Sequence, residues 1–98
     1  MANVVKRQDG NAVEWTLVPD RLQVTIVSPE QTLFEGIVDS ITVPGEKGRF
    51  EVLKGHAPII SSLTAGTVVC TGENPYELEI SGGFVEVAHN RVSLCVEA

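Results

Sequence analysis

Residues 81–96 read Ser-Gly-Gly-Phe-Val-Glu-Val-Ala-His-Asn-Arg-Val-Ser-Leu-Cys-Val, and this stretch decides the fold class. From Arg91 onward, apolar residues alternate with polar ones, which is the period of a strand with one buried face. His89-Asn90 predicts a two-residue hairpin turn, because both residue types are enriched at positive φ. Gly82-Gly83 predicts a bulge or a close backbone approach. Phe84, Val85 and Val87 are expected to form the first strand of this hairpin, with the Phe84 ring in the core. The second strand is expected to place Val92, Leu94 and Val96 on one side.

The same period recurs through the chain on the N-terminal side of this hairpin. Leu22, Val24 and Ile26 alternate with less apolar neighbours and predict a strand. Residues 37–43 predict a second long strand, with Ile37, Ile41 and Val43 on one face and Val38 interleaved. Shorter strands are predicted over residues 49–53, from residue 59, over 67–71 and over 76–80, separated by turns rich in Gly and Pro.

Composition agrees with this pattern. The 98 residues make one domain, and 28 of them are Val, Ile or Thr against six Ala, which favours strands over helices. No apolar run approaches the ~18 residues of a membrane-spanning helix, and the first residues lack the apolar segment of an export signal. The sequence therefore predicts an all-β fold, a small β-sandwich or flattened barrel of about eight to ten mostly antiparallel strands.

The first eighteen residues are expected to form an extension of the β-sandwich domain, which we assign to residues 19–98. Residues 1–11 are polar and show no periodicity, which predicts disorder. Residues 13–18 alternate and contain Trp15, the only tryptophan of the chain. They predict an edge strand or a segment that packs on a partner.

The net charge of −6 argues against a general nucleic-acid or anionic-membrane binder. Lys47, Arg49 and Lys54 nevertheless lie within eight residues, just before His56. This local cluster is either a solvated loop or a surface that faces a partner.

Cys70 and Cys95 show neither a CxxC motif nor the spacing of a metal site. Each lies within an apolar strand pattern, which predicts buried, reduced thiols rather than a disulfide. A reducing, cytosolic compartment fits this prediction.

The sequence offers little support for catalysis. Ser61 or Ser62 could be combined with His56 and Asp39 in a hydrolase, but no nucleophile elbow surrounds either serine. The two histidines are isolated, and no glycine-rich loop has the pattern that cradles a phosphate. We expect a chain without enzyme activity, metal or cofactor. His56 is expected to cap a turn, to present a donor and an acceptor to a partner chain, or both.

Several short motifs in a fixed order resemble one family. Over residues 22–96, they are similar to the N-terminal β-sandwich domain of the epsilon subunit of the rotary, proton-translocating ATP synthase. The motifs are Ile26-Val27-Ser28-Pro29-Glu30, Leu33-Phe34-Glu35-Gly36, Val43-Pro44-Gly45-Glu46, Lys54-Gly55-His56-Ala57-Pro58, Ser81-Gly82-Gly83-Phe84 and Gly83-Phe84-Val85-Glu86-Val87.

This resemblance implies a non-catalytic rotor subunit of the central stalk, which couples the gamma subunit to the membrane c-ring during proton-driven ATP synthesis. The chain would lie on the cytoplasmic side of the bacterial inner membrane, associated with it only through the complex. Residues implied to contact gamma are Ser28, His56, Ala57 and Pro58. Residues implied to contact the c-ring are Glu46, Lys47, Arg49, Phe50 and Glu51.

The chain departs from the family pattern in two respects. Arg49 and Glu51 stand where many relatives have an acidic residue and a glycine, which partly inverts the charge at the expected c-ring contact. Residues 96–98 also fall where most relatives begin a two-helix domain, so the ATP binding and inhibition carried by that domain are not expected here. The alternative is a free-standing β-sandwich module that binds a ligand or a protein. Co-purification with gamma separates the two, and five aromatic residues are few for an aromatic-lined pocket.

Overall fold

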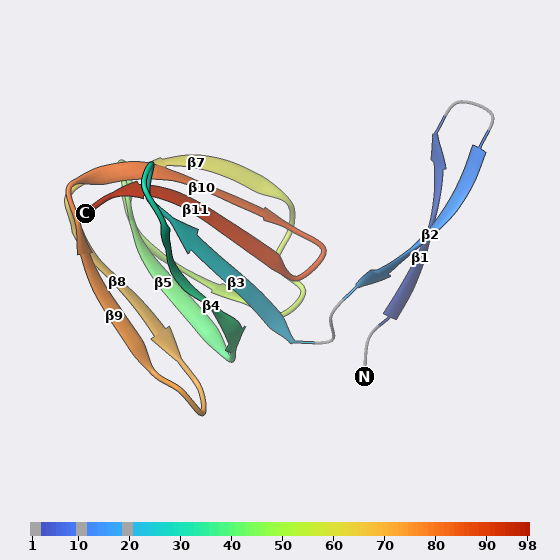
Figure 1. The fold of residues 1–98 in the computed structure, drawn as a ribbon, viewed down its shortest axis with the longest axis horizontal. Helices are drawn as coiled ribbons and strands as arrows, with labels where there is room; N and C mark the ends of the chain where they lie inside the picture. Colours follow the sequence, from blue (N-terminus) through green and yellow to red (C-terminus); the bar gives the residue numbers. More distant parts are fainter. Residues whose placement is uncertain (1–2, 10–11, 19–20) are drawn as a thin grey trace.

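The computed structural model describes residues 3–9, 12–18 and 21–98, with side chains described from Arg21 onward. Strands β1 (Asn3–Asp9) and β2 (Ala12–Val18) pair antiparallel in a two-stranded sheet of their own (Figure 1). The strand expected over residues 13–18 corresponds to β2. Strand β1 covers Asn3–Asp9 of the segment where the sequence predicts disorder, and residues 1–2 and 10–11 of that segment lie outside the described residues. The division of the chain into residues 1–18 and 19–98 stays a prediction.

Nine further strands form one sheet. They are β3 (Leu22–Val27), β4 (Thr32–Val38), β5 (Ser40–Gly45), β6 (Gly48–Leu53), β7 (Ile59–Leu63), β8 (Gly66–Thr71), β9 (Tyr76–Ile80), β10 (Gly82–Ala88) and β11 (Arg91–Glu97). Their order is β4-β3-β11-β10-β7-β5-β8-β9, with β6 paired to β5. Neighbouring strands are antiparallel except β11 and β3, which are parallel. The all-β prediction is confirmed.

The sheet curls where β5 meets β7. These two strands share a single register pair, Gly45 with Leu63. One half of the sheet is therefore β4-β3-β11-β10-β7, and the other is β6-β5-β8-β9. Figure 1 shows the curl, with β7, β10 and β11 on one side and β8 and β9 on the other. Such a curl lets the inward faces of the two halves share one core.

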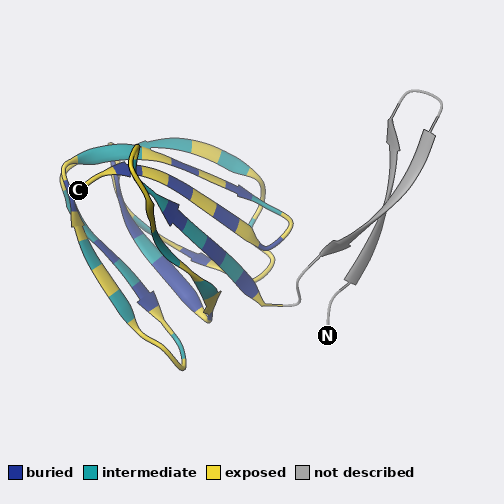
Figure 2. Cartoon of the chain, viewed as in Figure 1, coloured by how far each residue is buried: buried dark blue, intermediate teal, exposed yellow. Residues whose placement is uncertain are grey.

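The core follows the two-residue period of the strands. Along β3 and β11 every second residue is buried, and Figure 2 shows these buried positions alternating with intermediate ones in β3 and with exposed ones in β11. The predicted inward residues of these strands are confirmed as buried. The buried hydrophobic residues are Leu22, Val24, Ile26, Val38, Ile41, Val43, Val52, Leu63, Val68, Cys70, Ile80, Val85, Val87, Val92, Leu94 and Val96.

The prediction that Phe84 packs in the core is wrong, because its side chain is 60% exposed. Its neighbour Val85 is fully buried. Since successive strand residues point to opposite faces, Phe84 must lie outside once Val85 and Val87 lie inside. The strand was located correctly, but the large aromatic side chain belongs to its outer face.

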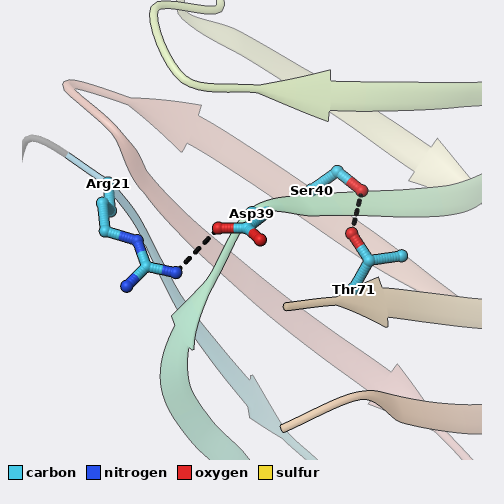
Figure 3. Close-up of polar contacts among 4 residues, drawn as sticks. All are labelled: Arg21, Asp39, Ser40 and Thr71. Atoms are coloured by element: carbon cyan, nitrogen blue, oxygen red, sulfur yellow. Dashed lines mark hydrogen bonds and ion pairs between the residues drawn. The ribbon is translucent and has the colours of Figure 1, made fainter. Parts of the chain in front are cut away.

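The segment from Ile37 to Val43 is two strands rather than one. The chain turns at Asp39, where its N–H donates to the carbonyl of Thr71 and its carboxylate pairs with Arg21 at 2.7 Å. Next to this corner, the hydroxyls of Ser40 and Thr71 hydrogen-bond at 2.6 Å (Figure 3). The corner changes the phase of the alternation, so Ile37 is 43% exposed although the sequence placed it on the same face as Ile41 and Val43, which are buried.

Both cysteines are free, in agreement with the prediction of reduced thiols. Cys70 is buried, as expected, but Cys95 is exposed. The reason is again the strand period, because Cys95 stands between the inward residues Leu94 and Val96. An apolar neighbourhood in the sequence did not distinguish the two faces of β11.

The β10–β11 hairpin forms as predicted. His89 and Asn90 have φ values of 51° and 60°, so the two-residue turn has the positive φ expected of it. Gly83 has a φ of 150°, and a Cβ placed there would lie 2.3 Å from the carbonyl oxygen of Cys95. The predicted close backbone approach is therefore confirmed at Gly83.

Candidate functional site

The register of the strands defines two ends of the sandwich. One, here called the Glu46 end, carries the β5–β6 turn at Glu46-Lys47 and the β3–β4 turn of residues 28–31. The other, here called the Asn90 end, carries the β10–β11 turn and the β6–β7 loop of residues 54–58. Gly45 pairs with Leu63, and Leu63 pairs with Gly83, which places the start of β10 at the Glu46 end.

Ser28, an expected gamma contact, lies at the Glu46 end. Its N–H donates to the Gln31 carbonyl at 2.8 Å, and its hydroxyl oxygen accepts from the Gln31 N–H at 3.3 Å. These bonds close the turn after β3 around the exposed Pro29. The sequence therefore places Ser28 here for a local reason, since serine commonly closes such turns.

His56, Ala57 and Pro58, the other expected gamma contacts, lie at the Asn90 end. The His56 N–H donates to the carbonyl of Leu53 at 3.1 Å, and the ring Nδ1 lies 2.7 Å from the carbonyl oxygen of Ala57. Because a carbonyl oxygen only accepts, Nδ1 is the donor in this contact. The ring thus helps to hold the loop, while its contact with a partner chain stays a prediction.

Asn90 organises this end of the molecule, and the sequence reasoning missed this function. Its side-chain Oδ1 accepts from the Gly55 N–H at 2.8 Å, and its main-chain carbonyl accepts from the Gln23 N–H at 2.9 Å. Asn90 is 8% exposed and joins the β6–β7 loop to β3 and the hairpin turn. Its positive φ was predicted from the residue type, but a bond to a residue 35 positions away left no local signal.

An exposed surface connects the two ends. We call it the outer face and define it by Val27, Ile60, Phe84, Glu86 and Cys95. Phe84 pairs with Cys95, Cys95 with Val27, and Glu86 with Ile60, and paired strand residues share a face. Ile60 is 74% exposed, so this face carries two large apolar side chains, Ile60 and Phe84, that the core does not use.

Two grooves mark the ends of the outer face. The first, at the Glu46 end, is lined by Val27, Ser28, Pro29, Gly83, Phe84, Cys95, Val96 and Glu97. The second, at the Asn90 end, is lined by Pro58, Ile59, Ile60, Glu86, Val87 and Ala88. The expected gamma contacts therefore fall at opposite ends of the sandwich, one beside each groove, with the outer face between them.

The expected c-ring contacts extend from the β5–β6 turn along the edge strand β6. Glu46, Lys47 and Glu51 are exposed. The Arg49 guanidinium is held, since it donates to the carbonyl of Thr67 at 2.8 Å. Phe50 is half-buried over Gly45, where a Cβ would come within 2.9 Å of the ring. Arg49 and Phe50 thus contact neighbouring strands of the sheet in addition to forming part of the surface of β6.

The hydrolase alternative finds no support in this geometry. The Asp39 carboxylate accepts from Arg21, while His56 Nδ1 points to the Ala57 carbonyl. A catalytic histidine needs its orienting carboxylate at that nitrogen. Within residues 21–98, whose side chains are described, no group of three His, Cys, Asp or Glu side chains could hold a metal ion.

Comparison with protein families matches residues 21–98 to the ATP synthase Delta/Epsilon chain, β-sandwich domain. The chain belongs to this family. The match confirms the resemblance that the sequence motifs indicated, and it covers the nine-stranded sheet from β3 to β11. Strands β1 and β2 lie outside the matched residues.

Curated members of the Delta/Epsilon family give the same result. An ATP synthase epsilon chain from Leptospira borgpetersenii serovar Hardjo-bovis is 40% identical over 78 residues, which are 79% of this chain and 61% of the relative. One from Chlorobaculum tepidum is 40% identical over 74 residues, which are 74% of this chain and 84% of the relative. The chain therefore spans about three fifths of the Leptospira relative and most of the Chlorobaculum relative.

Two solved structures share the fold of this family member. A chain of the Euglena gracilis mitochondrial ATP synthase OSCP/F1/c-ring assembly matches 93% of this chain and 56% of its own length, with a TM-score of 0.75 and 24% identity. A chain of the Tetrahymena thermophila mitochondrial ATP synthase central stalk and c-ring matches 80% of this chain and 64% of its own length, with a TM-score of 0.66 and 18% identity. None of the described residues belongs to a helix long and apolar enough to cross a membrane.

Proposed function

We propose that this chain is a non-catalytic rotor subunit of the ATP synthase central stalk, coupling gamma to the c-ring during proton-driven ATP synthesis. It would bind on the cytoplasmic side of the bacterial inner membrane and reach the membrane only through the complex. Membership of the Delta/Epsilon family supports the assembly. The subunit contacts are argued from the surface of the sandwich.

The observation that carries the proposal is the exposed apolar outer face. Phe84 and Ile60 are mostly exposed although large apolar side chains are usually withdrawn from water. The face runs between the groove beside Ser28 and the groove beside Pro58. One partner lying along β10 and β11 would therefore touch both sets of expected gamma contacts. Apolar anchors inside a polar rim are typical of protein interfaces.

The Glu46 end is the proposed c-ring contact. Glu46, Lys47 and Glu51 present exposed charges there, and Arg49 adds a cation whose position is fixed by Thr67. Exposed charges of both signs contribute more to the specificity of an interface than to its affinity. On this turn they would fix how the polar loops of a partner align with it. The core shared by the two halves of the sheet lets the domain act as a rigid wedge between this end and the outer face.

Co-purification with gamma tests this function, with point variants to locate the contact. Phe84→Glu and Glu86→Lys each place a changed charge on the outer face, and both are expected to weaken gamma association at least tenfold. Glu77→Lys is the matched control, because Glu77 is an exposed strand glutamate on β9, in the other half of the sheet. It should bind gamma like the unmodified chain.

Two results would contradict the proposal. Failure of the unmodified chain to bring down gamma would favour the free-standing module. Equal loss of binding in Glu77→Lys and Glu86→Lys would remove the outer face as the contact.

A further inference from the structure

The β1–β2 hairpin has an unexplained row of apolar residues. Its register pairs Val4 with Leu17, Lys6 with Trp15 and Gln8 with Val13. Paired residues at alternate positions share one face of a hairpin, so Val4, Val13, Trp15 and Leu17 belong to the same face, together with Lys6 and Gln8. The positions of β2 between its three apolar residues, Glu14 and Thr16, are polar. Strand β2 is therefore amphipathic in its sequence pattern over residues 13–17.

Such a hairpin needs a surface to cover its apolar row. An isolated two-stranded hairpin is at best marginally stable in water, and packing against another element is the usual remedy. The hairpin does not obtain this by strand pairing, since β1 and β2 pair only with each other. The strand that follows them, β3, already has β4 and β11 as neighbours. Both edges of β3 are therefore already paired, and β2 cannot join the sheet there.

Arg21, three residues after the end of β2, lies at the Asn90 end. Arg21 pairs with Asp39 at 2.7 Å (Figure 3), and the N–H of Gln23 is held by Asn90. This end carries the groove of Pro58 and Ile60. The Asn90 end is separated from the Glu46-Lys47 turn by the length of a strand. Because a seven-residue strand is about 23 Å long, the hairpin can reach well beyond the edge of the outer face.

Comparison with a solved structure indicates that the shared fold includes part of the first twenty residues. The Euglena match covers 93% of 98 residues, which is about 91 residues and exceeds the 78 residues of 21–98 by about 13. The shared fold therefore extends into the first twenty residues, where the family match does not reach. The Tetrahymena match, at 80%, corresponds in extent to the sandwich alone.

We propose that the β1–β2 hairpin is a docking arm, whose apolar face binds the same protein subunit that covers the outer face. This rests on the proposed function, which identifies that subunit as gamma. The arm extends the contact past the Asn90 end, on the side away from the Glu46-Lys47 turn. It would enlarge an interface that the outer face begins, with Trp15 as a central apolar anchor.

Trp15 supplies the test, because it is the only tryptophan of the chain. In the full chain alone, we expect its fluorescence to be quenched readily by acrylamide. Addition of a purified, tryptophan-free gamma subunit of the same ATP synthase should shift its emission to shorter wavelength and protect it from the quencher. Trp15→Ser and Leu17→Ser should each weaken gamma binding at least fivefold, and the matched control Thr16→Ser, at the intervening register position, should not.

Folding is checked independently of binding. The buried core begins at Leu22, so the melting curves of all three variants should coincide with that of the unmodified chain. Gamma binding with unchanged Trp15 fluorescence would overturn the arm and leave the proposed function standing. Trp15 already protected in the chain alone would overturn it too, since the face would be covered by the sandwich or a second copy. Absence of gamma binding by the full chain would overturn both proposals.

Discussion

Phe84 and Val85 are neighbours in β10, but one side chain is mostly exposed and the other is buried. The predictions for single residues depend on such differences in burial. Phe84 faces outward and is available to a partner, whereas Val85 faces the core. The identity of a side chain did not decide its face. The phase of the strand did, and that phase is set by the complete set of apolar positions along β10 and β11.

Phe84→Ala should change the stability of the isolated chain by less than about 1 kcal/mol, because most of the ring is already in water. Leu94→Ala, at a fully buried position, should cost about 2–5 kcal/mol. Urea unfolding of the two variants checks the pair. A larger loss of unfolding free energy for Phe84→Ala than for Leu94→Ala would contradict the placement of Phe84 outside and Leu94 in the core.

The two thiols should differ strongly in reactivity. Cys95 is exposed and should react with a thiol reagent without denaturant, while Cys70 should react only after unfolding. Burial raises the pKa of Cys70 to about 11, which keeps it in the less reactive thiol form at neutral pH. Mass analysis of the labelled, digested chain assigns each label. Simultaneous labelling of both cysteines in the native state would contradict the burial of Cys70.

The same thiol predicts a pH dependence of stability. Burial raises the pKa of Cys70 from 9.0 to about 11, so the folded chain keeps a proton that the unfolded chain releases between these values. Its contribution to stability is complete below pH 9 and should fall by about 2–3 kcal/mol as the pH rises to 11. Urea titrations from pH 8 to 11 should show a steeper loss for the unmodified chain than for Cys70→Ala. Parallel curves would contradict this contribution.

At the scale of elements, periodicity and turn residues predicted most strands of the sandwich. Residues 76–80 became β9 with the expected bounds, and the His89-Asn90 turn has the expected φ values. The strand break at Asp39 could not be predicted, because it depends on Arg21 and Thr71, which lie far away in the sequence. Local patterns show which residues alternate, but they do not show where long-range bonds turn the chain.

Gly83→Ala should be one of the most destabilising single changes in the β10–β11 hairpin. An added Cβ would lie 2.3 Å from the Cys95 carbonyl oxygen, and the φ of 150° strains any other residue, so a loss of more than about 2 kcal/mol is expected. Gly82→Ala is the matched control, since the nearest atom to its Cβ is 3.7 Å away. Comparable melting temperatures for the two variants would show that the strands separate easily at this point.

At the scale of the whole molecule, the arrangement of the site was beyond local reasoning. Motif order placed Ser28 and His56 in the same contact set, but the register separates them to opposite ends of the sandwich. Their relation depends on the parallel pairing of β3 with β11, between residues 68 positions apart. The outer face was also missed, because the sequence pattern assigned Phe84 to the core and Ile60 to an apolar strand segment without a side.

Arg49→Glu tests the Glu46 end in the assembled enzyme. The isolated fold should persist, with a loss of about 1 kcal/mol for the hydrogen bond to Thr67. In the reconstituted complex, the rate of proton-driven synthesis should change, and the change should shrink as salt screens the contact. Arg49→Gln, which removes the charge without reversing it, should have a smaller effect. Unaltered synthesis with Arg49→Glu would remove this residue from the c-ring contact.

The parallel pairing of β3 with β11 also imposes an order in time. Gln23 cannot meet its register partner Arg91 until the intervening strands have been synthesised. At about 5–20 residues per second, the ribosome needs roughly 3–14 s for that distance. During this interval, one side of β3 has no neighbour and its unpaired backbone can recruit other strands. The nascent sandwich should therefore close late and in a single step, and chaperones that shield an open strand edge would act on it in those seconds.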